Sequence, residues 1–198
     1  MYYFSRAVNS VHSEDIKRLM RQSSGPDLIS FAGGMPNNDL FPIDDVDEIY
    51  NRLSSDMKKT CFQYGPTSGH PALRKAVKQR LLSKGLSEEG NKLLITTGSL
   101  QAISIITQEF VNEGDVVLAE NPSFVGALSV FETYGAEVHA IPIDEHGIRV
   151  ESLIKKIESL DKKPKLLYLM PNFHNPAGVS YSLQRRKELL KALHGRGI

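Results

Sequence analysis

The stretch KLLITTGSLQAISIITQEFVNEGDVVLAENPSFVGALSVFETYGAEVHAIPI, from Lys92 to Ile143, decides the fold. Short apolar runs alternate in it with longer segments whose apolar residues recur at helical spacing, and glycines close the helical segments. The pattern predicts, in order, strand 92–99, helix 100–114, strand 115–120, helix 121–135 and strand 136–143. Strands that are apolar nearly throughout and alternate with helices are typical of a parallel sheet that is covered on both faces.

The same alternation continues outward from this stretch. On its C-terminal side we expect helix 149–160, strand 163–171 and helix 182–197. On its N-terminal side we expect an arm or helix over 1–24, a brief strand within 28–34, and helices 43–56 and 71–84, the last opened by Pro71. The sequence therefore predicts an α/β fold of three layers, a mostly parallel sheet with helices on both faces.

Composition and charge narrow the class of ligand. The chain has 198 residues, 40% hydrophobic and 24% charged, which is ordinary for a globular protein. A formal net charge of +1 provides no large basic or acidic field, so we expect a small-molecule ligand and neither nucleic acid nor membrane as a partner. The single cysteine, Cys61, excludes an internal disulfide, and the N-terminus lacks the apolar core of a secretory signal. We expect a cytoplasmic protein.

In open α/β sheets, ligands bind outside the carboxyl ends of the strands, so the loops that follow strands are the candidate site. The segment TTGSLQA places Gly98, Ser99 and Leu100 between a predicted strand and a helix. Free backbone N–H groups, the helix dipole and a hydroxyl together suit a phosphate there. The alternative is that Gly98 and Ser99 only turn the chain and cap the helix, and the glycine-rich nucleotide fingerprints are absent.

Two further loops extend this candidate site. Phe124 follows the next strand, just inside a helix start, where its ring can face a flat ligand or fill the core. Asn175 lies between Pro171 and Pro176 after strand 163–171, and its amide can donate to an oxygen or simply shape a turn. Together the loops offer an anion cradle, an aromatic platform and a polar donor, which fits pyridoxal phosphate.

The loop sequences resemble those of class I/II, fold-type I aminotransferases dependent on pyridoxal phosphate, particularly the branch of 2-aminoadipate, kynurenine and multi-substrate enzymes. The resemblance covers nearly the whole chain from Ile29 onward. It is carried, in the family's order and spacing, by ISFAGGMPNNDLFP (29–42), QYGPTSGHPALRKAV (63–77), TTGSLQAI (96–103), GDVVLAENPSFVGAL (114–128) and MPNFHNPAGVSYS (170–182). It implies the large domain of fold-type I enzymes in truncated form.

The resemblance also implies roles for individual residues. Gly98, Ser99 and Leu100 would hold the phosphate of pyridoxal 5'-phosphate, Phe124 would stack on its pyridine ring, and Asn175 would donate to its phenolic oxygen. Gly34 and Asn175 would bind the substrate, with the Gly34 backbone close to the substrate carboxylate. Tyr64 would reach the cofactor phosphate of a partner subunit in a homodimer. No metal is expected.

Family members run to about twice this length, and their second half carries the Schiff-base lysine. No lysine of this chain lies in the family's motif, so we expect no catalytic residue here, an N-terminal portion, and no transamination by this chain alone. The predicted organisation is an arm or helix over 1–28, a segment over 29–60 that links the arm and small-domain side to the large domain, and the N-terminal part of the cofactor-binding domain over 61–198.

Other functions stay open at this stage. The full-length protein would exchange an amino group between an amino acid and a 2-oxo acid, but lyases and decarboxylases share the fold. A non-catalytic fragment is one alternative, and the effector-binding domain of an aminotransferase-like transcription regulator is another. The sequence does not select one amino-acid substrate.

Overall fold

The structure is a computed structural model that describes Tyr3 and residues 36–198. The chain divides into two compact units, of which one spans Met35–Gly98 and the other contains Ser99–Ile198. The predicted arm or helix over 1–24 and the strand within 28–34 lie outside the described residues, as does Gly34. The predicted domain boundaries after residues 28 and 60 stay predictions.

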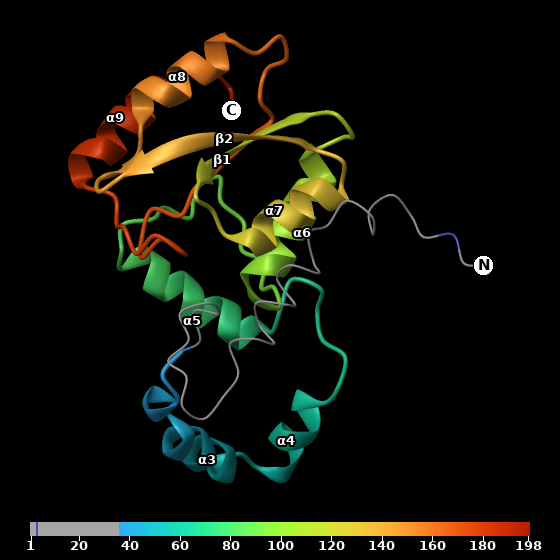
Figure 1. Cartoon of the computed structure of the whole chain (residues 1–198). Coiled ribbons are helices and arrows are strands. Elements are labelled where there is room, and N and C mark those ends of the chain that lie inside the picture. The colour runs from blue at the N-terminus through green and yellow to red at the C-terminus, as the bar shows by residue number, and fades with distance from the viewer. Residues whose placement is uncertain (1–2, 4–35) are drawn as a thin grey trace. The chain divides into compact units, whose positions relative to one another are not determined.

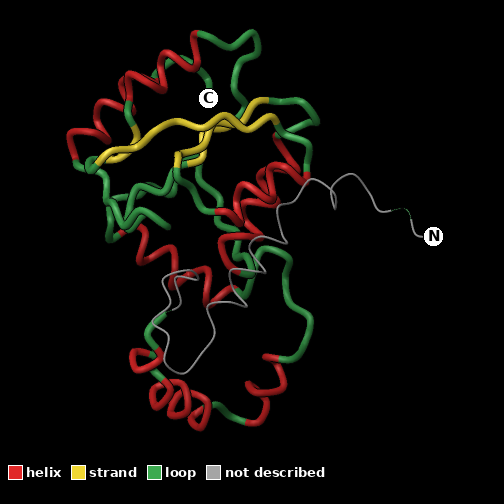
Figure 2. The backbone as a smooth tube through the Cα atoms, viewed as in Figure 1, coloured by secondary structure: helices red, strands yellow, loops and turns green. Residues whose placement is uncertain are grey.

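A four-stranded sheet forms the centre of the unit that contains Ser99–Ile198 (Figures 1 and 2). Its strands are β1 (Val116–Asn121), β2 (Glu137–Asp144), β3 (Gly147–Ile148) and β4 (Leu166–Tyr168), in the spatial order β3-β2-β1-β4. β1 pairs in parallel with both β2 and β4, and only the short β3 runs antiparallel, beside β2. The predicted mostly parallel sheet is confirmed.

Helices cover both faces of this sheet (Figure 1). They are α6 (Gly98–Phe110) and α7 (Val125–Thr133) on one face, and α8 (Val150–Glu158) and α9 (Leu183–Leu193) on the other. Successive residues of β1 point to opposite faces. Val116 and Leu118 therefore belong to the core cluster that includes Leu153 of α8 and Leu189 of α9, while Val117 packs in a second cluster with Phe131 of α7. The three-layer arrangement follows.

The Met35–Gly98 unit is helical in its described residues. It consists of the short 3-10 helix η1 (Asn38–Leu40), α3 (Ile43–Arg52), α4 (Ser55–Cys61) and α5 (Pro71–Leu82), which begins with proline as predicted. The single helix predicted over 43–56 is wrong, because Leu53 is extended (ψ 133°) and the Ser54 hydroxyl accepts from Met57 N–H at 3.2 Å, which starts a new helix. Among the described residues no helix is long and apolar enough to cross a membrane.

The strand predicted over 92–99 is not formed. Residues 92–96 are irregular, and α6 already begins at Gly98. A strand requires a neighbour that pairs with its backbone, and the four strands of the sheet do not include one for this segment. The main-chain contact that Ile95 makes is a donation from its N–H to Ser68 O at 3.1 Å, from the loop before α5.

Candidate active site

The first turn of α6 carries the three residues predicted to hold a phosphate. Gly98 has a left-handed backbone (φ 77°), and a β-carbon added there would meet no atom within 4 Å. Ser99 and Leu100 are exposed. N–H groups in the first turn of a helix have no intrahelical acceptor, so Ser99 and Leu100 carry donors at the positive end of the helix dipole.

Phe124 is the N-cap residue of α7, one position before the helix in which the sequence placed it. Its half-buried ring packs against the cluster of Val117 and Phe131 and also covers Gly126. A β-carbon at Gly126 would lie 2.6 Å from Phe124 Cζ and 3.3 Å from Leu100 Cδ1. The structure therefore brings Leu100 and Phe124 together over a glycine that leaves room for both.

Asn175 lies on the segment that connects β4 to α9. Its side chain is exposed and makes no hydrogen bond within the described chain, while its backbone N–H lies 2.9 Å from Met170 Sδ. β1 and β4 are parallel neighbours, with Ala119 opposite Tyr168, so the segments that follow them leave the sheet at one edge. Phe124 and Asn175 belong to those two segments, as the sequence predicted.

Tyr64 lies in the Met35–Gly98 unit, on the loop after α4. Its side chain is fully exposed, and its backbone N–H donates to Gln63 Oε1 at 2.8 Å. The role predicted for Tyr64, at the cofactor phosphate of a partner subunit, stays a prediction. The role of Gly34 also stays a prediction, since that residue lies outside the described part of the chain.

A buried polar cluster that the sequence did not predict lies beneath Asn175. Glu120, which follows the apolar residues Val116–Ala119 in strand β1, is 2% exposed. Its carboxylate accepts from Met170 N–H at 2.7 Å and from the Tyr181 hydroxyl, and His174 Nε2 lies 3.2 Å away. Burial, reinforced by the hydrogen bond to Glu120, raises the pKa of the Tyr181 phenol well above its ordinary range. A charged residue directly after an apolar run could have signalled this cluster, because buried charges need partners.

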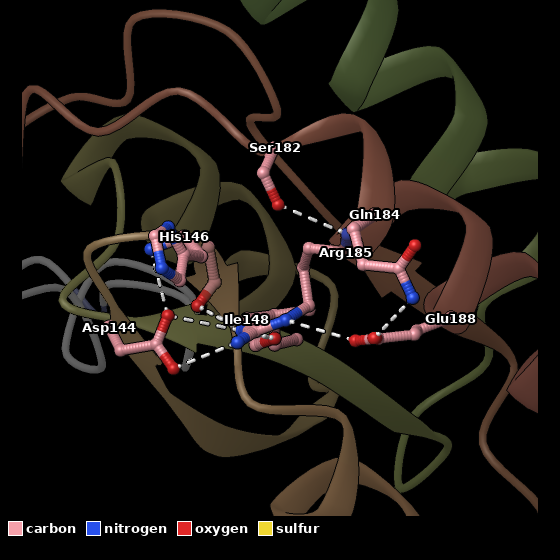
Figure 3. Close-up of polar contacts among 8 residues, drawn as sticks. Asp144, His146, Ile148, Ser182, Gln184, Arg185 and Glu188 are labelled. Atoms are coloured by element: carbon pink, nitrogen blue, oxygen red, sulfur yellow. Dashed lines mark hydrogen bonds and ion pairs between the residues drawn. The ribbon is translucent and has the colours of Figure 1, made fainter.

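An ion pair fixes the start of α9 (Figure 3). The Arg185 guanidinium donates to both carboxylate oxygens of Asp144, at 3.1 and 3.0 Å, and to the carbonyls of Gly147 and Ile148. The Ser182 hydroxyl caps α9 by accepting from Arg185 N–H at 3.1 Å. The hydrogen bonds from Arg185 hold the pKa of the Asp144 carboxyl below its ordinary value. The pair joins β2, β3 and α9 directly after Tyr181.

The residues at this edge fit a planar, phosphorylated ligand. The exposed first turn of α6, the half-exposed Phe124 ring and the exposed Asn175 amide supply a phosphate donor set, a flat platform and a polar donor. The Ser123 hydroxyl beside Phe124 is buried and has no hydrogen-bond partner in the described chain, so the edge also has unused bonding capacity. Among the described residues no group of three or more His, Cys, Asp or Glu side chains is arranged for a metal ion.

A doubly covered, mostly parallel sheet defines an α/β protein, and the loops at the carboxyl ends of the strands are where proteins of this class bind ligands. The family model for aminotransferase class I and II matches residues 27–198, and the chain belongs to this family. The pyridoxal-phosphate dependence that the sequence suggested is a property of that family.

Relatives and solved structures agree with this membership. The aromatic-amino-acid aminotransferase 1 of Thermococcus litoralis is 34% identical over 96% of this chain, which spans 46% of that protein. The crystal structure of Pyrococcus horikoshii kynurenine aminotransferase, in complex with PMP, has a TM-score of 0.87 and 35% identity over 96% of this chain and 48% of its own. An uncharacterized HTH-type transcriptional regulator of Bacillus subtilis, YdfD, is 27% identical over 95% of this chain and 38% of its own. The chain therefore spans about half the length of the curated aminotransferase that it matches.

Proposed function

We propose that this chain supplies the pyridoxal-phosphate-binding part of an aminotransferase that moves an amino group between an amino acid and a 2-oxo acid. The observation that carries the proposal is the meeting of Leu100 and Phe124 over Gly126, beside the segment that bears Asn175. A phosphate donor set and a ring platform at one sheet edge are what a flat phosphorylated cofactor requires.

Three parts of the chain contact the cofactor in this proposal. Backbone N–H groups of Ser99 and Leu100, with the Ser99 hydroxyl, hold the phosphate, and the left-handed Gly98 starts the turn that presents them. Phe124 stacks on the pyridine ring, and the Asn175 amide donates to the phenolic oxygen. The bound cofactor withdraws electrons from the substrate's amino-bearing carbon, while these residues orient it and fix its charged groups.

The family resemblance supplies the remaining parts of the proposal. The backbone of Gly34 receives the substrate carboxylate, and Asn175 also contacts the substrate. Tyr64 contacts the phosphate in a partner subunit, so the working form is a homodimer, which we expect in the cytoplasm. We also propose that this chain alone does not transaminate, because none of its lysines lies in the family's lysine motif.

An absorbance titration of the 198-residue chain with pyridoxal phosphate tests this proposal, followed by borohydride reduction and mass spectrometry. The expected result is saturable binding without a unique lysine adduct, weakened at least about tenfold by Asn175→Ala or Phe124→Ala. Ser129→Ala, on the following helix and away from the proposed contacts, serves as the control and should bind as the parent does. Absence of saturable binding would contradict the cofactor site, and one stoichiometric lysine adduct would contradict the proposed inactivity.

A second candidate is the effector-binding domain of an aminotransferase-like transcription regulator, which the similarity to YdfD favours. Both candidates use the same cofactor site, so binding of pyridoxal phosphate does not separate them. Turnover by the full-length protein does: formation of a 2-oxo acid from an amino acid supports the enzyme, whereas a saturable spectral change without product supports the regulator.

A further inference from the structure

The segment from Met170 to Tyr181, here called the Asn175 turn, is tied to one buried carboxylate. Glu120 Oε2 accepts from Met170 N–H at 2.7 Å, and Glu120 Oε1 accepts from the Tyr181 hydroxyl. Met170 and Tyr181 are the two ends of the turn. A single side chain of β1 therefore closes the loop in which Asn175 lies.

His174 connects the middle of the turn to the same carboxylate. Its ring is buried, and its Nδ1 accepts from Ala177 N–H at 3.3 Å, which in a neutral ring places the proton on Nε2. Nε2 lies 3.2 Å from Glu120 Oε2, yet no hydrogen bond of good geometry joins the two atoms. The short distance is therefore an electrostatic contact and not a hydrogen bond.

The outer side of the turn is held as well. The Arg186 guanidinium donates to Pro171 O at 2.7 Å and to Asn172 Oδ1 at 2.8 Å. Phe173, two residues before Asn175, has a left-handed backbone (φ 48°) that a residue with a side chain rarely adopts. Strained conformations of this kind persist where surrounding contacts determine them, and they concentrate at functional sites.

A buried carboxylate in a strand raises the free energy of the folded state unless donors compensate it. An apolar side chain at position 120 would fill the same space without the loss of hydration that a buried charge suffers. What the carboxylate adds is a pair of acceptor oxygens that face donors on the turn. We propose that Glu120 is a positioning residue whose buried carboxylate holds the Asn175 turn in the geometry that presents the Asn175 amide to the cofactor; this inference rests on the proposed function.

Glu120→Gln in the 198-residue chain tests the inference, because glutamine keeps the shape but offers an NH₂ group where one oxygen accepted. The first measurement is amide hydrogen exchange at Ala177 and Gly178, whose N–H groups bond to His174. We expect at least about tenfold faster exchange in the variant. Val117→Ala, a buried β1 substitution on the other face of the sheet, is the control because it lowers stability without touching the turn. After correction for its lower global stability, its exchange rates at both amides should stay near the parent's.

The second measurement is a double-mutant cycle on the dissociation constant for pyridoxal phosphate. Glu120→Gln should weaken binding about tenfold in the parent and less than about twofold in the Asn175→Ala background, since the residue acts through Asn175. Equal weakening in both backgrounds would overturn the inference, as would parent-like exchange at Ala177 and Gly178.

Failure of the variant to fold and failure of the parent to bind pyridoxal phosphate lead to different conclusions. If Glu120→Gln does not fold, Tyr181→Phe removes only the donor hydroxyl, and the same two measurements on it decide the inference with a smaller expected effect. If the parent chain binds no pyridoxal phosphate, the proposed function fails, while the exchange rates still decide whether Glu120 holds the turn.

Discussion

The Tyr181 ring packs directly against the backbone of Gly147. The Gly147 backbone is left-handed (φ 113°), and a β-carbon there would lie 2.5 Å from Tyr181 Cγ. The Tyr181 ring thus occupies the space of the missing side chain, and its hydroxyl reaches Glu120. The glycine is required both for its backbone conformation and for the close approach of the ring.

Gly147→Ala should lower the free energy of unfolding by about 2–4 kcal/mol, because the left-handed backbone penalty adds to an overpacked core. Urea unfolding followed by circular dichroism measures the change. Gly195→Ala is the matched control, since Gly195 is also left-handed (φ 73°) but has no atom near an added β-carbon. It should cost about 1–2 kcal/mol. Equal losses in the two variants would show that the Tyr181 contact contributes nothing.

Some residues of the candidate site could be predicted from the sequence, and others could not. Ser99, Phe124 and Asn175 were predicted because each follows a strand or predicted strand and has a side chain or turn suited to a ligand. The meeting of Leu100 with Phe124 over Gly126 could not be predicted, since it depends on side-chain directions that spacing does not fix. Glu120 was overlooked because it completes an apolar run, and only the fold reveals its donors.

At the scale of elements, the Arg185–Asp144 pair joins α9 to the end of β2. Arg185 is mostly buried and Asp144 is about a third exposed, so the pair is partly protected from solvent. Bidentate pairs of this geometry are the stronger kind of charged hydrogen bond. The same guanidinium binds the two β3 carbonyls, which explains how a strand of two residues keeps its place.

Asp144→Asn should cost about 1–2 kcal/mol of unfolding free energy at pH 7. Because the folded-state pKa of Asp144 lies below its ordinary value of 3.8, the pair's contribution is complete above that pH and is lost as pH falls through the lower folded-state pKa. In urea unfolding of parent and variant from pH 7 to 3, the difference in unfolding free energy should therefore be largest near pH 7 and shrink as the pH falls below 3.8. Asp161→Asn, at an exposed site without an ion pair in the described chain, is the control for the lost charge, and its difference from the parent should stay near zero. A difference for Asp144→Asn that does not vary with pH would contradict the assignment.

Sequence periodicity predicted most elements of the sheet unit, because apolar runs alternate there with segments of helical spacing, and glycine or proline closes most of them. It was wrong where tertiary pairing decides. The apolar run at 92–97 has strand composition but no neighbouring strand, and the break at Leu53 depends on a cap at Ser54. β3 was missed because two residues carry no period.

At the scale of the whole molecule, burial is unevenly distributed. Every buried residue of the described chain lies between Thr107 and Leu189, and residues 36–98 are exposed or half-buried throughout. Local opening costs little free energy where few apolar side chains are buried. The two units should therefore differ in their protection from solvent exchange.

Hydrogen exchange with mass spectrometry measures this difference. Amides of β1 and α8 should exchange at least about a hundredfold more slowly than those of α3 and α5, after correction for intrinsic rates. Because α5 and α8 are both short helices with hydrogen-bonded backbones, their comparison controls for secondary structure. Similar protection in α5 and α8 would contradict the prediction.

The short strand β4 has a consequence for handling the protein. In the described part of the chain it pairs only with β1, and a cavity of about 260 Å³ beside it is lined mostly by apolar side chains of α6 and of residues 166–169. A strand edge next to apolar surface is a template on which another molecule can extend the sheet. During refolding, collisions between chains compete with folding at this edge. The yield of native protein should therefore fall as protein concentration rises, and dilute, cool conditions should favour recovery.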